Sequence, residues 1–125
     1  MDVKNDNDFN TKYCLRTKNL AIEIFKEFDA RYTKESTRIV VRQILRSVTS
    51  VAANFCAASR SRSRAEYYSK ICIVVEECDE TLFWLEFLFE AGLHPQDRLH
   101  EKIIETKELL KVFATAKMKL RDKMT

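Results

Sequence analysis

Apolar residues recur every three or four positions along most of this chain, a spacing that places them on one face of an α-helix. The first such segment is expected at about residues 11–31, with an inward stripe of Leu20, Ala21, Ile24, Phe25 and Phe28. The second is expected at about 36–58, with an inward stripe of Val40, Val41, Ile44, Val48, Val51 and Phe55. Polar residues at 29–36 separate the two, so the pattern predicts two amphipathic helices joined by a turn.

The start of a third helix is indicated by Ser63 and Glu66, which have the spacing of a capping box. This helix is expected to run to about residue 91, where Gly92 can adopt the left-handed conformation that ends many helices. Pro95 suits the first position of a fourth helix. Residues 117–125 are expected as a frayed basic tail, and the inward residues of the fourth helix are expected to be Leu99, Ile103, Leu110 and Phe113.

The third helix carries more apolar residues than one core stripe requires. One stripe consists of Tyr67, Ile71, Val74, Cys78, Leu82, Leu85 and Phe89. A second stripe consists of Tyr68, Cys72, Val75, Phe83, Trp84 and Phe87. A helix that is apolar nearly all round must be covered nearly all round, and in a small domain the simplest cover is another copy of the chain. The pattern therefore predicts a homo-oligomer with Phe83, Trp84 and Phe87 at its interface.

The composition agrees with long helices and few turns. The 125 residues include one glycine and one proline, although turns depend on these residue types. We therefore expect an all-α, antiparallel up-down four-helix bundle as a single domain over 1–125, with residues 1–10 as a polar tail. No apolar run approaches the ~18 residues of a membrane span, and the polar, acid-bearing first residues are unlike a secretory signal. A cytoplasmic protein without membrane contact is expected.

The residues that carry metal or catalytic chemistry are too few and too scattered for an enzyme. The four cysteines, Cys14, Cys56, Cys72 and Cys78, lack the short spacings of zinc ligands. We expect them to be reduced and to pack as small apolar side chains. A di-metal bundle needs two Glu-x-x-His pairs, but neither His94 nor His100 has a glutamate three residues earlier. Nucleophile–histidine pairs and a Gly-rich phosphate loop are also missing from the sequence. The sequence predicts no catalysis, no metal and no cofactor.

Charge is strongly segregated along the chain. Residues 31–70 carry nine bases and two acids, whereas residues 76–108 carry ten acids and three bases. Arg38, Arg42 and Arg46 recur every four residues and share one helix face. A second arginine cluster fills the connector before the third helix and comprises Arg60, Arg62 and Arg64. Because the guanidinium fork binds phosphate oxygens well, the six arginines predict binding of RNA or DNA.

The connector arginines are the first candidates, since a connector reaches a ligand more freely than a packed helix does. Tyr67 and Tyr68 just beyond could stack on bases. Two alternatives remain open. The basic and acidic segments could pair across subunit interfaces without any nucleic acid. The chain could also be an oligomeric scaffold whose acidic or aromatic surface binds another protein.

Several short motifs in the middle of the chain resemble one bacterial family. They are Arg42-Gln43, Arg46-Ser47, Ser50, Ala53-Asn54, Ser63-x-x-Glu66-Tyr67, Lys70, Glu76-Glu77-x-Asp79-Glu80-Thr81, Trp84-Leu85 and Ala91-Gly92-Leu93. Together they are similar to the four-helix-bundle proteins, some of which are encoded in intervening sequences of large-subunit ribosomal RNA genes. Another branch contains the accessory variability protein of diversity-generating retroelements.

The resemblance covers the second and third expected helices closely and the first and fourth only by pattern. It implies a bundle that assembles into a ring, typically a pentamer, without enzymatic activity. The retroelement branch implies a reverse transcriptase and nucleic acid as partners. The chain departs from the family pattern where Cys56-Ala57-Ala58 replaces the common Ala-Glu-Gly and where Arg60 replaces a frequent glycine.

Overall fold

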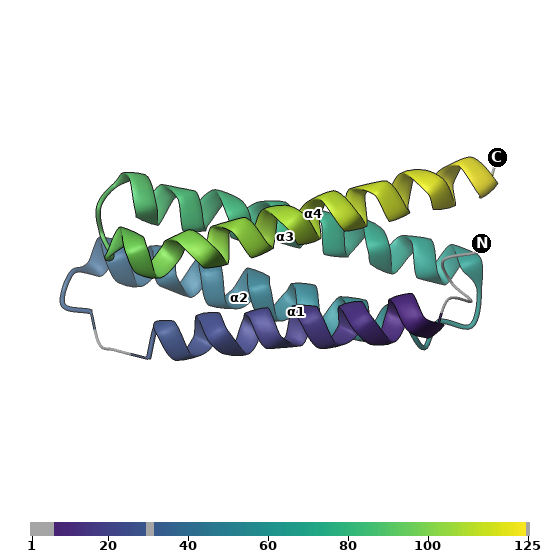
Figure 1. Ribbon diagram of the computed structural model, residues 1–125, viewed down its shortest axis with the longest axis horizontal. Helices are drawn as coiled ribbons and strands as arrows, with labels where there is room; N and C mark the ends of the chain where they lie inside the picture. The colour runs from purple at the N-terminus through teal and green to yellow at the C-terminus, as the bar shows by residue number, and fades with distance from the viewer. Residues whose placement is uncertain (1–6, 30–31, 125) are drawn as a thin grey trace.

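The chain folds into four long helices that run alternately up and down (Figure 1). The computed structural model describes residues 7–29 and 32–124. All regular secondary structure in these ranges is helical, which confirms the all-α antiparallel bundle. The helices are α1 (Asn7–Glu27), α2 (Glu35–Ala58), α3 (Arg64–Glu90) and α4 (Gln96–Met124).

The core follows the predicted stripes in most places. All six apolar residues predicted on α2 are buried, as are four of the five predicted on α1. The exception on α1 is Phe25, which is 55% exposed because its side chain lies at the outer edge of the stripe. On α3, Leu82 and Phe89 are only partly buried, and on α4 Leu109 takes the buried place predicted for Leu110.

The ends of α3 follow the predicted signals. The Ser63 hydroxyl accepts a hydrogen bond from the backbone amide of Glu66 at 3.1 Å, so the serine caps the helix. Gly92 has a φ of +67°, and the Leu93 amide donates to the Leu88 carbonyl, which satisfies a carbonyl at the helix end. Pro95 stands just before α4, where its carbonyl accepts from the Arg98 amide, and not at the first helical position.

The outer ends of α1 and α4 differ from the prediction. Residues 7–10 belong to α1 and not to a polar tail, because Asn10 is buried and accepts a hydrogen bond from the Tyr67 hydroxyl at 2.7 Å. The predicted end of the first helix at about residue 31 is too late, because α1 ends at Glu27 and neither Phe28 nor Asp29 is helical. The predicted tail residues 1–6 lie outside the described residues. Residues 117–124 continue α4 and are not frayed, because Ala116 and Leu120 remain buried against the core.

The prediction of four reduced cysteines is wrong for one pair. Cys14 of α1 and Cys56 of α2 form a disulfide with their Cα atoms 4.9 Å apart. The antiparallel packing of the two helices brings these residues together although 42 positions separate them. Cys72 and Cys78 are thiols, and burial raises the pKa of the Cys78 thiol to about 12.

Candidate nucleic-acid interface

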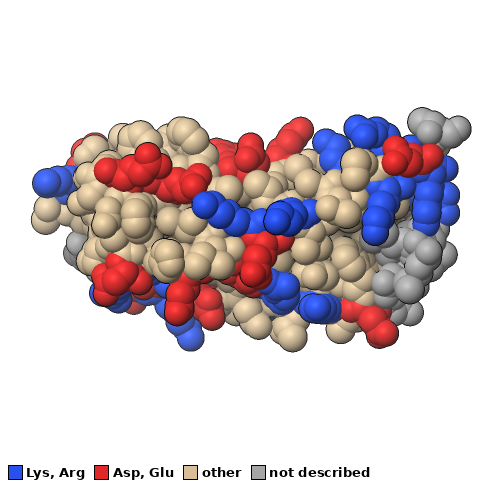
Figure 2. All heavy atoms as spheres, turned by 45° about the horizontal axis from the view of Figure 1, so that its top comes forward, with Lys and Arg blue, Asp and Glu red and all other residues tan. Residues whose placement is uncertain are grey.

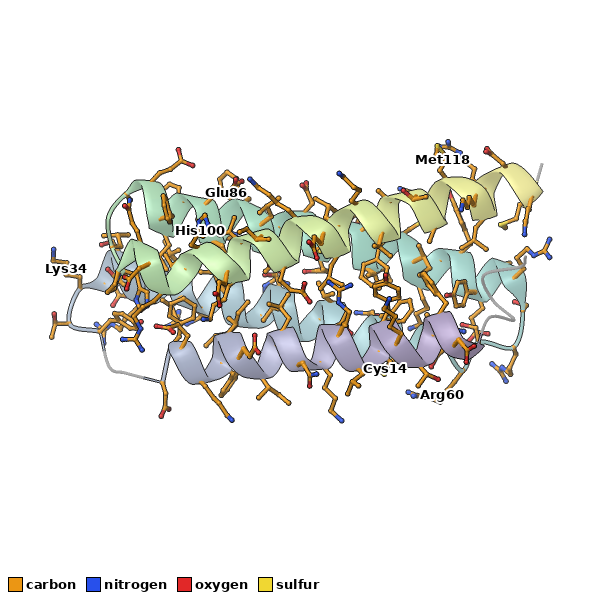
Figure 3. All side chains as sticks on the ribbon, in the orientation of Figure 1. Cys14, Lys34, Arg60, Glu86, His100 and Met118 are labelled. Carbon is orange, nitrogen blue, oxygen red and sulfur yellow. A yellow bond between two sulfur atoms is a disulfide. The ribbon has the colours of Figure 1, made fainter. Side chains whose placement is uncertain are left out.

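Arg60 lies at the end of the bundle opposite Lys34 (Figure 3). Arg62 follows it in the same connector and Arg64 begins α3, so all three arginines belong to this end. Arg60 is exposed, the Arg62 side chain is 91% exposed, and Arg64 is half-buried at the start of α3. The Arg62 Nε atom lies 3.8 Å from a carboxylate oxygen of Glu66. Ion pairs this exposed contribute little to stability, so Arg62 can leave its partner for a phosphate at small cost.

The last two turns of α4 bring more cations to the same end. In an antiparallel bundle the end of α2, the start of α3 and the end of α4 lie together, and Figure 2 shows Lys and Arg gathered where α4 ends. The hydrogen bond with Cys72 raises the pKa of the Tyr68 phenol, and the nearby charge of Arg121 opposes that rise. Arg121 therefore lies close to the first turns of α3. We call this surface the basic end; its residues are Arg60, Arg62, Arg64, Lys117, Lys119, Arg121 and Lys123.

The two tyrosines predicted to stack on bases have different surroundings. Tyr67 is fully buried and its hydroxyl is bonded to Asn10, so its ring cannot meet a base. Tyr68 is only half-buried, and Arg121 is near enough for its charge to act on the phenol. Of the two tyrosines, only Tyr68 has a ring that a nucleic-acid base can reach.

The other predicted arginines line a different surface, a groove between α1 and α2. Arg38, Arg42 and Arg46 stand along a hollow of about 840 Å³ whose apolar side is formed by Phe25 and Leu45, with Tyr32 near its end. A second hollow of about 350 Å³ continues it past Phe25 toward Lys18 and Cys56. None of the described residues that line either hollow is acidic. We call this continuous surface the arginine groove.

The three groove arginines differ in the partners that hold them. Arg38 bonds Glu35 at 2.7 Å, and both side chains are exposed. Arg46 contacts both carboxylate oxygens of Glu80 at 2.8 Å, and this hydrogen bonding raises the pKa of Arg46. Arg42 forms no ion pair with any described residue, so its charge faces the groove without compensation.

Glu80 also connects the groove to the outer face of α3. The Trp84 Nε1 atom donates to Glu80 at 3.4 Å, while the neighbouring Glu77 lies 3.8 Å from Arg46. Burial raises the pKa of the Glu77 carboxyl, Arg46 opposes the rise, and Glu80 adds to it. Part of the segregated charge is thus paired inside one chain, by an α2 base and α3 acids.

The predicted interface residues form a continuous aromatic surface on α3. Phe83 and Phe87 are 56% and 45% exposed, and Trp84 is half-buried. The Trp84 ring centroid lies 4.9 Å from that of Phe83 and 5.6 Å from that of Phe87. Glu86 and Glu90 border a shallow hollow beside the two phenylalanines. We call Phe83, Trp84 and Phe87 the aromatic ridge; their role in self-association stays a prediction.

A buried polar cluster at the other end of the bundle was not predicted. The Glu27 carboxylate accepts a hydrogen bond from His94 Nε2 at 2.7 Å and forms ion pairs with Arg98, whose Nε lies 2.9 Å away, and with Lys102, whose Nζ lies 3.5 Å away. The second ring nitrogen of His94 lies 3.2 Å from the Tyr32 hydroxyl. Glu27 and His94 are 67 positions apart, so local spacing gives no signal for this contact. These side chains hold α1 to the start of α4. We call the cluster of Glu27, Tyr32, His94, Arg98 and Lys102 the clasp.

Two general features bear on the class of protein. No helix within residues 7–29 and 32–124 combines the length and apolar character that a bilayer span requires. Over the same residues, no group of three histidine, cysteine or carboxylate side chains converges as metal ligands.

Comparison with known proteins places the chain in a family. The profile of the 23S rRNA-intervening sequence proteins matches residues 10–115, which include most of all four helices. The chain belongs to this family. The resemblance found in the middle of the sequence is therefore confirmed. No curated protein is similar enough to this 23S rRNA-intervening sequence protein to count as a match.

A solved structure agrees with the fold. It is a crystal structure of a protein of unknown function from the S23 ribosomal protein family of Bacteroides thetaiotaomicron VPI-5482. The similarity has a TM-score of 0.73 and 24% sequence identity, and covers 85% of this chain and 95% of that one. At this identity the comparison supports the helical fold alone.

Proposed function

We propose that this 23S rRNA-intervening sequence protein is a non-enzymatic accessory protein that binds RNA or DNA through its basic end. The observation that carries the proposal is the convergence of two basic segments, the α2–α3 connector and the last turns of α4, on one end of the bundle. The carboxylates of these segments, Glu66 and Asp122, are few beside the cations. Such a patch attracts a phosphate backbone over a range of several ångströms.

The chemistry of the basic end favours backbone contacts over reading of sequence. Arginine and lysine side chains on exposed turns bond phosphate oxygens, which position a nucleic acid but carry no base information. Tyr68, half-buried in the first turns of α3, adds one ring at the edge of the patch. The expected ligand is therefore a structured RNA or a duplex, held with little sequence preference and with strong dependence on salt.

The test is a titration of nuclease-treated protein against a structured RNA and a duplex DNA at several salt concentrations. Replacing Arg60, Arg62 and Arg64 by alanine removes up to three phosphate contacts. Each contact contributes about 0.9 to the slope of log affinity against log salt on duplex DNA, so the slope should fall by up to about 3. Affinity at low salt should fall as well.

A matched control removes three other cations from exposed positions away from both arginine clusters. This variant carries Lys26→Ala, Lys107→Ala and Lys111→Ala, and has the same net charge as the connector variant. It should keep the wild-type slope. An unchanged slope in the connector variant, or an equal fall in both variants, would contradict a site at the basic end.

A protein-binding scaffold is the second candidate function, and the aromatic ridge is the observation that favours it. Two phenylalanines that are about half exposed on one helix face are unusual on a monomer surface. If the titrations show no binding of either nucleic acid at low salt, the scaffold function is the one that remains.

A further inference from the structure

The Cys14–Cys56 disulfide can be reached from solvent on two sides. Both cysteines are only half-buried. Cys14 lines a hollow of about 480 Å³ together with Thr11 and Ser59, and Cys56 lines the hollow of about 350 Å³ between α1 and α2. Figure 3 shows Cys14 toward the same end of the bundle as Arg60. A small thiol can therefore approach the bond, which it could not do if the disulfide were enclosed in the core.

Lys18 gives both approaches a positive charge. It lines the hollow at Cys14 and the hollow at Cys56, and it is the only charged residue among the described residues that line either. Lys18 follows Cys14 by four positions, so the two side chains share one face of α1. Its side chain is exposed and pairs with no acid in the part of the chain that the structure describes. A cation at this place attracts an anionic thiol and stabilises the thiolates that form during exchange.

The backbone also provides for the reduced state of the pair. The Cys56 sulfur lies 3.6 Å from the backbone carbonyl oxygen of Cys14. In the disulfide this sulfur carries no proton, but as a thiol it can donate a weak hydrogen bond to that oxygen. The oxidised and the reduced forms therefore fit the same backbone, with Cys56 as the sulfur that leaves.

The first turns of α1 bury little apolar surface of their own. Between residues 8 and 17 the buried side chains, Asn10 and Thr17, are polar, and the buried apolar residues of α1 begin at Leu20. Phe9 and Tyr13 pack against the core but are only partly buried. This part of the helix therefore depends on specific ties to the rest of the bundle.

Those ties include a single covalent bond. Asn10 accepts the hydrogen bond of Tyr67, and Arg16 donates from Nε to a carboxylate oxygen of Glu105 at 3.1 Å. The Arg16–Glu105 pair is partly exposed, and such pairs contribute little. The disulfide is the one tie that solvent cannot compete with. Breaking it makes local detachment of these turns easier.

We propose that Cys14, Cys56 and Lys18 form a site where a negatively charged, low-molecular-weight thiol reversibly opens the disulfide and so loosens the first turns of α1. The first thiolate attacks Cys14 Sγ from the hollow beside Lys18. A mixed disulfide forms while the Cys14–Cys56 bond breaks, and the electron pair leaves on Cys56 Sγ, which takes a proton from water.

A second thiol molecule completes the reduction. Its thiolate attacks the bound thiol's sulfur, and the Cys14 thiolate leaves and is protonated. Two thiols are oxidised to one small disulfide, and the protein disulfide is reduced to two thiols. The small disulfide drives the same steps in reverse. The reaction needs no nucleic acid, so it is tested apart from the proposed function.

The first experiment measures the rate of reduction by two thiols of similar size. 2-Mercaptoethanesulfonate is anionic and 2-mercaptoethanol is neutral, and mass spectrometry of alkylated Cys14 and Cys56 peptides follows both reactions. In Lys18→Ala the ratio of the anionic to the neutral rate constant should fall by about threefold at low ionic strength. This is the effect of two unit charges about 6 Å apart in water, and high salt should abolish it.

Lys12→Ala is the matched control for this experiment. Lys12 lies on the same helix and its loss changes the net charge equally, but it lines neither hollow. This variant should keep the wild-type ratio. An unchanged ratio in Lys18→Ala, an equal fall in Lys12→Ala, or a disulfide that neither thiol reduces in the folded protein would overturn the site.

The second experiment measures hydrogen exchange of the α1 amides in the disulfide and the dithiol forms. The rate for residues 12–17, divided by the rate for residues 20–26, should rise at least about tenfold on reduction, because the lost crosslink acts on the first turns. The division removes any general loss of stability. The double variant Cys14→Ser, Cys56→Ser should match the dithiol form without reductant. An unchanged quotient in the dithiol form would overturn the loosening of α1.

Discussion

Replacing Glu27 by glutamine should destabilise the protein more than its place at the end of a helix suggests. The Glu27 and His94 side chains are each 8% exposed, and the carboxylate accepts a hydrogen bond from His94 and forms ion pairs with Arg98 and Lys102. Glutamine keeps the shape and one acceptor oxygen but removes the charge. The three basic groups are then left without their common anion.

The size of the effect follows from these contacts. Removing one partner of a fully buried ion pair costs about 3–5 kcal/mol. Arg98 is 59% exposed and recovers hydration, and the amide oxygen keeps a weaker bond to His94, so the loss should be smaller. We expect the free energy of unfolding to fall by about 2–3 kcal/mol, which corresponds to a melting temperature lower by about 10 °C.

The effect should also depend on pH. Burial raises the pKa of Glu27, but the His94 hydrogen bond and the charges of Lys102 and Arg98 outweigh it, so the pKa is lowered from its usual 4.5. A carboxyl with a lowered folded-state pKa stabilises the fold above its unfolded pKa, and this contribution is lost as pH falls through the folded value. The stability difference between wild type and Glu27→Gln should be complete at pH 7 and should shrink below pH 4.5.

Urea unfolding followed by circular dichroism, at pH 7 and at several lower values, measures this difference. Glu23→Gln is the matched control, because Glu23 is an exposed acid on the same helix without an ion pair to a described residue. It should change the free energy of unfolding by less than about 0.5 kcal/mol. A loss that small in Glu27→Gln, or one that does not change with pH, would refute the clasp as a charged, stabilising cluster.

Two further predictions concern features that the sequence analysis did not predict. Reducing the Cys14–Cys56 disulfide, or replacing both cysteines by serine, should lower the free energy of unfolding by about 2–4 kcal/mol; equal melting curves with and without reductant would contradict the disulfide. Leu120→Ala should cost about 2–5 kcal/mol, because Leu120 is fully buried in α4, whereas the exposed Met118→Ala should be nearly neutral. Equal effects of the two substitutions in thermal unfolding would mean that the end of α4 does not pack.

Local signals predicted most of the fold. The inward stripe of α2, the serine cap of α3 and the glycine at its end depend on spacings of a few residues, and the structure has all three. Periodicity fixes the direction of a side chain only to within a broad sector, so Phe25 was placed inside although it lies at the edge. The end of α4 carried a usable signal, since Phe113, Ala116 and Leu120 continue the helical spacing into the stretch interpreted as a tail.

The features that sequence reasoning missed depend on contacts between distant segments. The disulfide requires the register of α1 against α2, and the clasp joins Glu27 to a turn 67 residues later. The basic end combines two stretches that look unrelated until the helices are known to run antiparallel. Charge composition predicted which residues could bind phosphate, but only the packing shows that the connector arginines share an end of the bundle with the cations of α4.

The hydrogen bond from Trp84 to Glu80 gives this protein an internal optical reporter. Trp84 is the single tryptophan of the chain, so its fluorescence comes from one known place, beside the exposed phenylalanines of α3. Its bonding partner Glu80 is the same carboxylate that holds Arg46 at the rim of the groove. A molecule that binds Arg46 and separates it from Glu80 changes the electric field at the Trp84 indole. Binding at the groove can therefore be followed as a shift in the wavelength of the Trp84 fluorescence, without an added label.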